Sequence, residues 1–292
     1  MAVLKGRRTT VEKEIIIKNF LLFVFLFKVI PSEIFDFFAV KILGIKTAKY
    51  WLKLLLDKGY LKAFWLDENV TAMKNKITGE QRLFYLSKEG LAVLKRNPDI
   101  GKYLGGYSLD RYRFKPCNFK FSLFQHNMAV MRSFVLLQAR DLNGRWRSEW
   151  MARGELFEGN DRRLTGLRIR LPDGVFVTTK GLRVAIECEL TLKNQKDSKG
   201  MMDNWKHDLM PKDGARKFDV ILLVCGTPSL FKKITERMSG CIQMNRDRYL
   251  VTTFDRLAQG AASCFEETDG KFKDWFADVR IDEFLSIDDV KV

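Results

Sequence analysis

Residues 182–190 (LRVAIECEL) constrain the fold more than any other short segment of this chain. Their β-rich composition predicts a strand, and the β-rich segment 175–179 (VFVTT) before them predicts that this strand is the second of a hairpin. Side chains two apart on a strand point to the same face. Glu187 and Glu189 are therefore expected to lie together, on the face opposite the apolar side chains of the strand.

Acidic and basic residues flank this hairpin. Asp173 precedes its first strand and Lys193 follows its second, and Lys193 shares the face of the two glutamates if the extended conformation persists. Crowded carboxylates repel one another unless a cation binds, and their hard oxygens are ligands that Mg²⁺ or Mn²⁺ prefers. We expect Asp173, Glu187 and Glu189 to hold such an ion. Lys193 can then neutralise a scissile phosphate.

An E-x-E pair is also common on the solvated face of an edge strand, which is the alternative interpretation. His126 and Glu149 are secondary candidates for the site. His126 is expected in the first turn of a helix over 122–141, where a capping or surface role is the alternative, and Glu149 belongs to a predicted strand over 145–150.

Helices and strands alternate after the hairpin. The patterns predict a polar helix over 193–210, an apolar strand over 217–226, a helix beginning after Pro228 and a strand over 248–254. This order predicts an α+β or α/β domain, in which helices flank a mixed sheet.

The first third of the chain has a different organisation. Helices are expected over 11–28, 31–42 and 46–58, with strands over 60–66 and 81–86, and a closing helix over 87–96. Gly44 and Gly59 are expected to end the second and third helices, and Ser87 to cap the last. Three helices followed by a hairpin predict a winged helix-turn-helix domain.

In such a domain the third helix enters the major groove and the wing touches phosphate. The following segment, 97–120, mixes aromatic and basic residues, which can lie along a nucleic acid backbone or pin the segment to a domain surface. A winged helix that binds protein, with solvated lysines, is the alternative. The residues expected to contact DNA are Lys46, Lys49, Lys53, Lys74, Lys76, Arg82, Arg111 and Arg113.

The charge favours a polyanionic partner. The chain has 51 Lys and Arg against 36 Asp and Glu, a net charge of +15, and the excess lies in residues 1–200. Nucleic acid is the simplest partner for this charge, although a basic surface that serves only solubility is the alternative.

Other classes are excluded by composition. Five widely spaced cysteines form neither a disulfide framework nor a zinc ribbon, and two histidines exclude a His-rich metal site. The strongest apolar run, 15–30, is interrupted by polar residues and is shorter than the ~20 residues of a membrane span. We expect a cytoplasmic protein without membrane insertion.

The spacing D-x13-E-x-E-x3-K resembles a variant of the PD-(D/E)xK signature of restriction-endonuclease-like nucleases. With a winged helix in front, P-D-G…E-x-E-x3-K resembles the MobC/TraX group of plasmid relaxases and the related replication-relaxation proteins, over residues 11–255. The pattern departs from that signature at Glu189, where a lysine is usual, and the available lysine is Lys193.

The resemblance implies that Asp173, Glu187 and Glu189 hold the divalent metal and that Lys193 assists at the phosphate. The implied reaction is a site- and strand-specific nick at a plasmid transfer origin, which starts conjugative mobilisation. The implied partners are DNA, double-stranded at the origin and single-stranded at the nick, and an accessory or coupling protein of the transfer machinery. The second hypothesis is a non-catalytic DNA-binding initiator or transcription regulator on a nuclease-derived scaffold.

The predicted organisation is a winged helix over 1–98, a linker over 99–120, a restriction-endonuclease-like domain over 121–260 and an acidic tail over 261–292. The nucleophile stays open between a metal-bound water and a side chain. The tyrosines available for a covalent link include Tyr103, Tyr107, Tyr112 and Tyr249.

Overall fold

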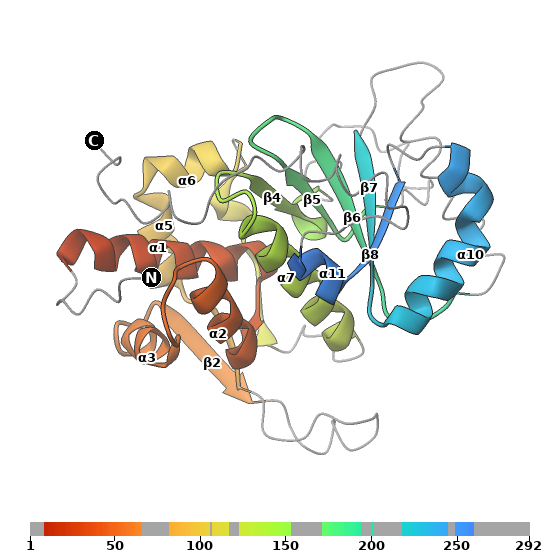
Figure 1. Ribbon diagram of the computed structural model, residues 1–292. Helices are drawn as coiled ribbons and strands as arrows, with labels where there is room; N and C mark the ends of the chain where they lie inside the picture. Colours follow the sequence, from red (N-terminus) through yellow and green to blue (C-terminus); the bar gives the residue numbers. More distant parts are fainter. Residues whose placement is uncertain are drawn as a thin grey trace. The chain divides into compact units, whose positions relative to one another are not determined.

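A computed structural model of the chain describes residues 9–65, 82–105, 107–116, 123–152, 171–193, 200, 218–244 and 249–259. The chain divides into two compact units, residues 1–122 and 123–292, which are described separately. Both contain helices and strands, so the predicted α+β class is confirmed at this level (Figure 1). No helix in the described ranges combines the length and the apolar character needed to cross a bilayer.

The first unit combines helices with a small antiparallel sheet in the order β1-β3-β2. The predicted helices and the two hairpin strands are present within a few residues of their expected bounds. The elements are α1 (Thr10–Phe27), β1 (Ile30–Pro31), α2 (Ser32–Lys41), α3 (Lys49–Asp57), β2 (Leu61–Trp65), β3 (Arg82–Leu86), α5 (Lys88–Lys95), α6 (Pro98–Tyr103) and the 3-10 turn η1 (Leu109–Arg111).

α1 is the buried helix of this unit. It begins at a capping box, in which Thr9 and Glu12 satisfy each other's backbone N–H groups, and it is apolar on nearly all sides because other elements surround it. Phe23 of α1 stacks on Phe38 of α2, with ring centroids 4.3 Å apart. Burial of such large aromatic side chains stabilises this core.

The turn between α2 and α3 is fixed by Asp36. Its Oδ1 accepts a hydrogen bond of 2.7 Å from the backbone N–H of Ala48 and one of 3.1 Å from the Thr47 hydroxyl. Gly44 and Gly59, with φ of +59° and +69°, follow the ends of α2 and α3 in the left-handed region that favours glycine, as predicted. These contacts set the direction in which α3 leaves α2.

The segment predicted as a linker contains structure. Most of α6 and the whole of η1 lie within residues 99–120, and Tyr112 is buried. Its hydroxyl donates to the Lys28 carbonyl at 2.9 Å and accepts from the Leu86 N–H at 3.2 Å. Residues 107–116 are thereby fastened to the first unit, which is the second of the two roles that the sequence left open for the aromatic residues of this segment.

The second unit has a five-stranded sheet in the sequential order β4-β5-β6-β7-β8. β4, β5 and β6 pair antiparallel, and β6, β7 and β8 pair parallel, so the sheet is mixed as predicted. The predicted helix over 193–210 lies largely outside the described residues. The elements are α7 (Phe124–Gln138), β4 (Arg145–Ser148), β5 (Gly174–Val177), β6 (Arg183–Glu189), β7 (Val220–Cys225), α10 (Pro228–Met244), β8 (Tyr249–Thr253) and α11 (Phe254–Gln259).

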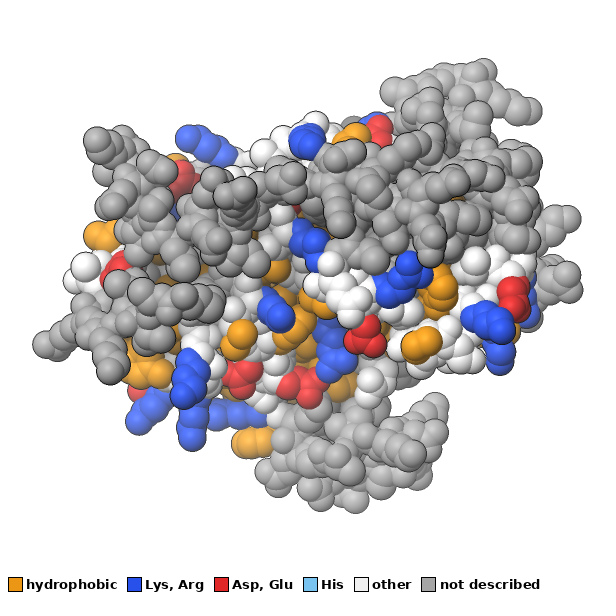
Figure 2. Space-filling view, in the orientation of Figure 1, with side chains coloured by type: hydrophobic (Ala, Val, Ile, Leu, Met, Phe, Trp, Pro, Cys, Tyr) orange, Lys and Arg blue, Asp and Glu red, His pale blue; other side chains and the backbone are white. Residues whose placement is uncertain are grey.

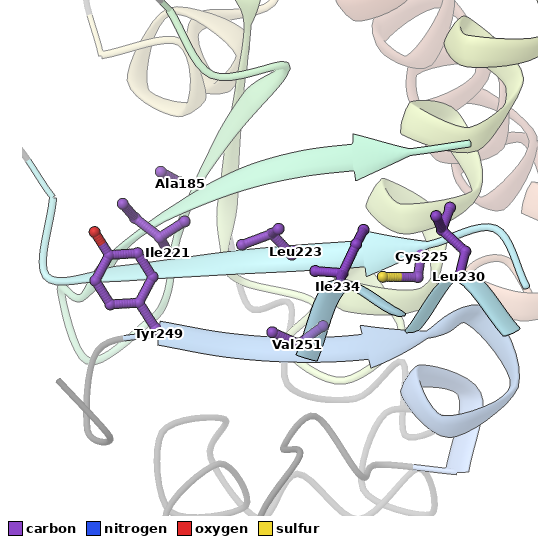
Figure 3. Close-up of a cluster of buried hydrophobic side chains, with 8 residues drawn as sticks. All are labelled: Ala185, Ile221, Leu223, Cys225, Leu230, Ile234, Tyr249 and Val251. Carbon is purple, nitrogen blue, oxygen red and sulfur yellow. The ribbon is translucent and has the colours of Figure 1, made fainter. Parts of the chain in front are cut away.

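Helices cover both faces of this sheet. α7 packs on one face, where Ser133 Oγ lies 3.3 Å from Cys188 Sγ. α10 packs on the other, where Leu230 and Ile234 join a buried cluster from β6, β7 and β8 (Figures 1 and 3). Alternate residues of β6 therefore point to different helices, which decides where its acidic side chains lie.

Candidate functional site

The two glutamates of β6 are buried on the α10 face of the sheet. Glu187 pairs in register with Leu223 and Glu189 with Cys225, and both partners belong to the α10 cluster. Each glutamate is only 4% exposed. Because β6 is the central strand of five, the alternative of a solvated edge strand is wrong. Two buried carboxylates on one face are costly unless hydrogen bonds or a cation offset their desolvation.

Asp173 is held at the start of β5, next to the glutamates. Its backbone N–H donates to the Ile186 carbonyl at 3.0 Å, which continues the β5–β6 ladder. Its Oδ2 accepts from the Cys188 N–H at 2.8 Å and lies 3.1 Å from His126 Nε2. His126 thus lies beside Asp173. The backbone N–H of Glu149 donates to the Asp173 carbonyl at 3.3 Å, so both secondary candidates adjoin this residue.

The glycine after Asp173 is required by packing. A Cβ at Gly174 would fall 2.0 Å from Cζ2 of Trp146, a residue of β4 that is 1% exposed. No side chain fits between them, so the indole of Trp146 lies directly against the Gly174 backbone. The Asp-Gly pair therefore places a carboxylate directly beside the residue on which the Trp146 indole packs.

Lys193 reaches Glu189 by a different path from the one predicted. β6 ends at Glu189, so the extended conformation does not persist to Lys193. The chain turns instead, and the Lys193 ammonium folds back onto Glu189 Oε1 as an ion pair. In α10, Arg237 donates from Nη1 to the Lys193 carbonyl. Arg237 carried no signal in the sequence that connected it with this site.

The three acids act together on their neighbours. The pKa of His126 is raised by its hydrogen bond to Asp173 and by the charges of Asp173, Glu187 and Glu189, which outweigh its partial burial. Burial and the same three carboxylates raise the pKa of the Cys188 thiol well above its ordinary value. Such a thiol stays protonated and is not a nucleophile.

The chemistry of the acidic donors fits a hard divalent cation. Within the described part of the chain, however, no three side chains of Asp, Glu, His or Cys converge closely enough to enclose a metal ion. Among the described residues, the Cys188 N–H and His126 both contact Oδ2 of Asp173, and Glu189 forms an ion pair with Lys193. Binding of an ion by all three acids would therefore require their side chains to rearrange.

The first unit carries the other predicted contacts. Lys and Arg side chains gather over α3 and the start of β2 (Figure 2). Lys49 and Lys53 of α3, and Lys46 just before it, are exposed. Tyr50, on the same helix, is 58% exposed. Lys74 and Lys76 lie outside the described residues.

Three predicted arginine contacts engage neighbouring groups. The Arg82 guanidinium lies over the rings of Trp65 and Phe84, at 5.7 and 5.4 Å from their centroids. Arg111 lies over the Tyr107 ring at 5.1 Å, and Arg113 donates to the carbonyls of residues 110 and 112. DNA binding by these arginines would have to use their remaining donors.

The tyrosines differ in access. Tyr107, Tyr112 and Tyr249 are buried, at 7%, 7% and 1% exposure, whereas Tyr103 is half-buried. Burial also raises the pKa of the Tyr112 hydroxyl, which disfavours its nucleophilic form. A covalent link through any of the three buried tyrosines would require local opening.

No family profile, curated protein or solved structure shows a significant match to this chain.

Proposed function

We propose that this protein is a metal-dependent DNA nickase, in which a winged helix binds the origin and a restriction-endonuclease-like domain cuts one strand. The proposal extends to a relaxase that starts plasmid mobilisation. One observation carries it: Glu187 and Glu189 are 4% exposed on a central strand, beside an Asp173 carboxylate that is held by two donors. Buried acids of this kind lower the stability of a fold, and we infer that they are kept because they serve a function.

In the proposed site, Asp173, Glu187 and Glu189 hold Mg²⁺ or Mn²⁺. The ion supplies a lowered pKa for a bound water and stabilisation of charge on a phosphoryl oxygen. The Cys188 N–H and His126 keep Asp173 in position, and Lys193 balances the charge of Glu189. The preference of carboxylate oxygens for hard cations supports this assignment.

The order of elements in the first unit supports the proposed winged helix. A turn fixed by Asp36 joins α2 and α3, and β2 and β3 form the antiparallel pair that a wing would extend. Lys46, Lys49 and Lys53 are exposed at or just before α3, where they can contact phosphates without reading bases. The proposed partner is thus duplex DNA, with a protein of the transfer machinery as a further partner and the cytoplasm as the location.

The nicking assay uses a supercoiled plasmid that carries the DNA flanking the protein's own gene. Open circles that form with Mg²⁺ or Mn²⁺, and not with EDTA, are the expected result. An Asp173→Ala variant should bind the plasmid and leave it uncut. Equal loss of binding and nicking in this variant would contradict the catalytic assignment.

A second candidate function is a DNA-binding initiator or transcription regulator without catalysis. The ion pair between Lys193 and Glu189 favours this second function, because the lysine occupies one of the proposed metal ligands. Such a protein would bind DNA with a steep salt dependence and would be indifferent to divalent ions. Retarded, uncut plasmid in every lane of the nicking assay is its signature, provided that the plasmid contains the target.

A further inference from the structure

The ammonium group of Lys193 forms an ion pair with the buried carboxylate of Glu189. The Glu189 side chain is 5% exposed and that of Lys193 is 33% exposed, and the two form an ion pair between positions i and i+4. Removal of the ammonium from Glu189 would leave a buried carboxylate without this compensation, which is strongly destabilising. A phosphate that approaches the site therefore meets a lysine whose charge is already balanced.

Arg237 brings a second positive charge to the same segment. It lies on α10, a helix that packs through Leu230 and Ile234 on the sheet face that carries the two glutamates. One guanidinium nitrogen donates to the Lys193 carbonyl, and the side chain is otherwise exposed. Among the described residues, no carboxylate forms an ion pair with it. A guanidinium has five N–H donors, so most of them stay available to a ligand.

We propose that Arg237 binds a phosphate of the DNA strand that enters the acidic site. This inference rests on the proposed function of the site. The planar guanidinium can donate two parallel hydrogen bonds to one phosphate, and its bond to the Lys193 carbonyl directs it toward the segment that follows β6. Arg237 thus adds a positive charge beside the segment that follows β6, whereas Glu189 stands where the resembled signature usually has a lysine.

DNA binding tests the contact without depending on cleavage. Fluorescence anisotropy in EDTA, at several salt concentrations, would compare the wild type with Arg237→Gln, Arg237→Lys and the control Lys232→Gln. Lys232 is also exposed on α10, and no described contact connects it with Lys193. Loss of one phosphate contact reduces the magnitude of the negative slope of log K against log salt by about 0.9.

We expect this reduction for Arg237→Gln, the wild-type slope for Arg237→Lys, and no change for Lys232→Gln. A purely structural role at the Lys193 carbonyl would leave the slope unaltered. An unaltered slope in Arg237→Gln, or an equal fall in Lys232→Gln, would overturn the inference. If Arg237→Gln does not fold, Arg237→Met removes the same charge and takes its place.

The nicking assay separates this inference from the proposed function. In a protein that nicks, Arg237→Gln should be slower by about 10- to 100-fold, as expected for loss of a charge-assisted hydrogen bond. A wild type that never nicks, together with a reduced slope in Arg237→Gln, would reject the nickase and retain the phosphate contact. A wild type that nicks, with Arg237→Gln equally fast, would reject the role of Arg237 alone.

Discussion

His126 Nε2 lies 3.1 Å from Asp173 Oδ2, so the first turn of α7 is tied to the residue that opens the β5–β6 hairpin. The same oxygen accepts the Cys188 N–H at 2.8 Å. One carboxylate thus connects a helix on one face of the sheet with the central strand. This connection makes the protonation of His126 a direct report on the state of the acidic site.

Removal of the Asp173 charge should lower the pKa of His126 toward its ordinary value of about 6.5. The Asp173→Asn variant removes the main cause of the raised pKa. NMR titration of the imidazole measures it, in a His207→Gln background that leaves His126 as the chain's remaining histidine. An exposed acid, Asp255, supplies the control Asp255→Asn, for which we expect no change.

The sign of the linked stability follows from the raised pKa. The His126–Asp173 interaction stabilises the folded chain fully below the unfolded pKa of about 6.5, and this contribution is lost as the pH rises through the raised value. An Asp173→Asn variant in which His126 titrates as in the wild type would contradict the contact.

Substitution of Gly174 should destabilise the second unit. Gly174→Ala forces a methyl group into the Trp146 indole, and such overpacking costs about 1–3 kcal/mol in the free energy of unfolding. Urea unfolding measures the loss. Gly101→Ala is the control, because a Cβ at Gly101 meets nothing within 4 Å in α6 and should leave stability unchanged or raise it by up to about 1 kcal/mol. Equal stability of Gly174→Ala and the wild type would refute the close approach of Trp146.

The lysines of α3 should determine the salt dependence of DNA binding. Lys49→Gln and Lys53→Gln should each reduce the magnitude of the negative slope of log K against log salt by about 0.9, if each lysine contacts one phosphate. Lys88→Gln, an exposed lysine of α5, is the matched control. Slopes that are the same for all three variants and the wild type would favour the alternative of a winged helix with solvated lysines.

Local patterns allowed much of this structure to be predicted. Glu187 and Glu189 share a face because the side-chain period of a strand is two, and Ser87 caps α5 by accepting from the Gly90 N–H at 3.0 Å. These features depend on residues that are close in the chain. They follow from backbone geometry and hydrogen bonding that any such sequence obeys.

Features that depend on distant pairing could not be predicted in this way. The central position of β6, which buries both glutamates, follows from its pairing with β7, a strand that begins 31 residues after the end of β6, at Val220. The two-residue strand β1 exists only because Ile30 pairs with Phe84. Arg237 meets Lys193 across 44 positions, and an exposed arginine on a helix has no pattern that reveals such a partner.

The central claim is that the acidic site cuts DNA that the rest of the chain binds. Its most direct test measures binding and nicking of the same supercoiled plasmid by the wild type, Asp173→Asn and Asp255→Asn, with Mg²⁺, Mn²⁺ or EDTA. We predict metal-dependent open circles from the wild type and Asp255→Asn, and full binding without nicking from Asp173→Asn. Nicking by Asp173→Asn at the wild-type rate, or nicking that persists in EDTA, would contradict the account.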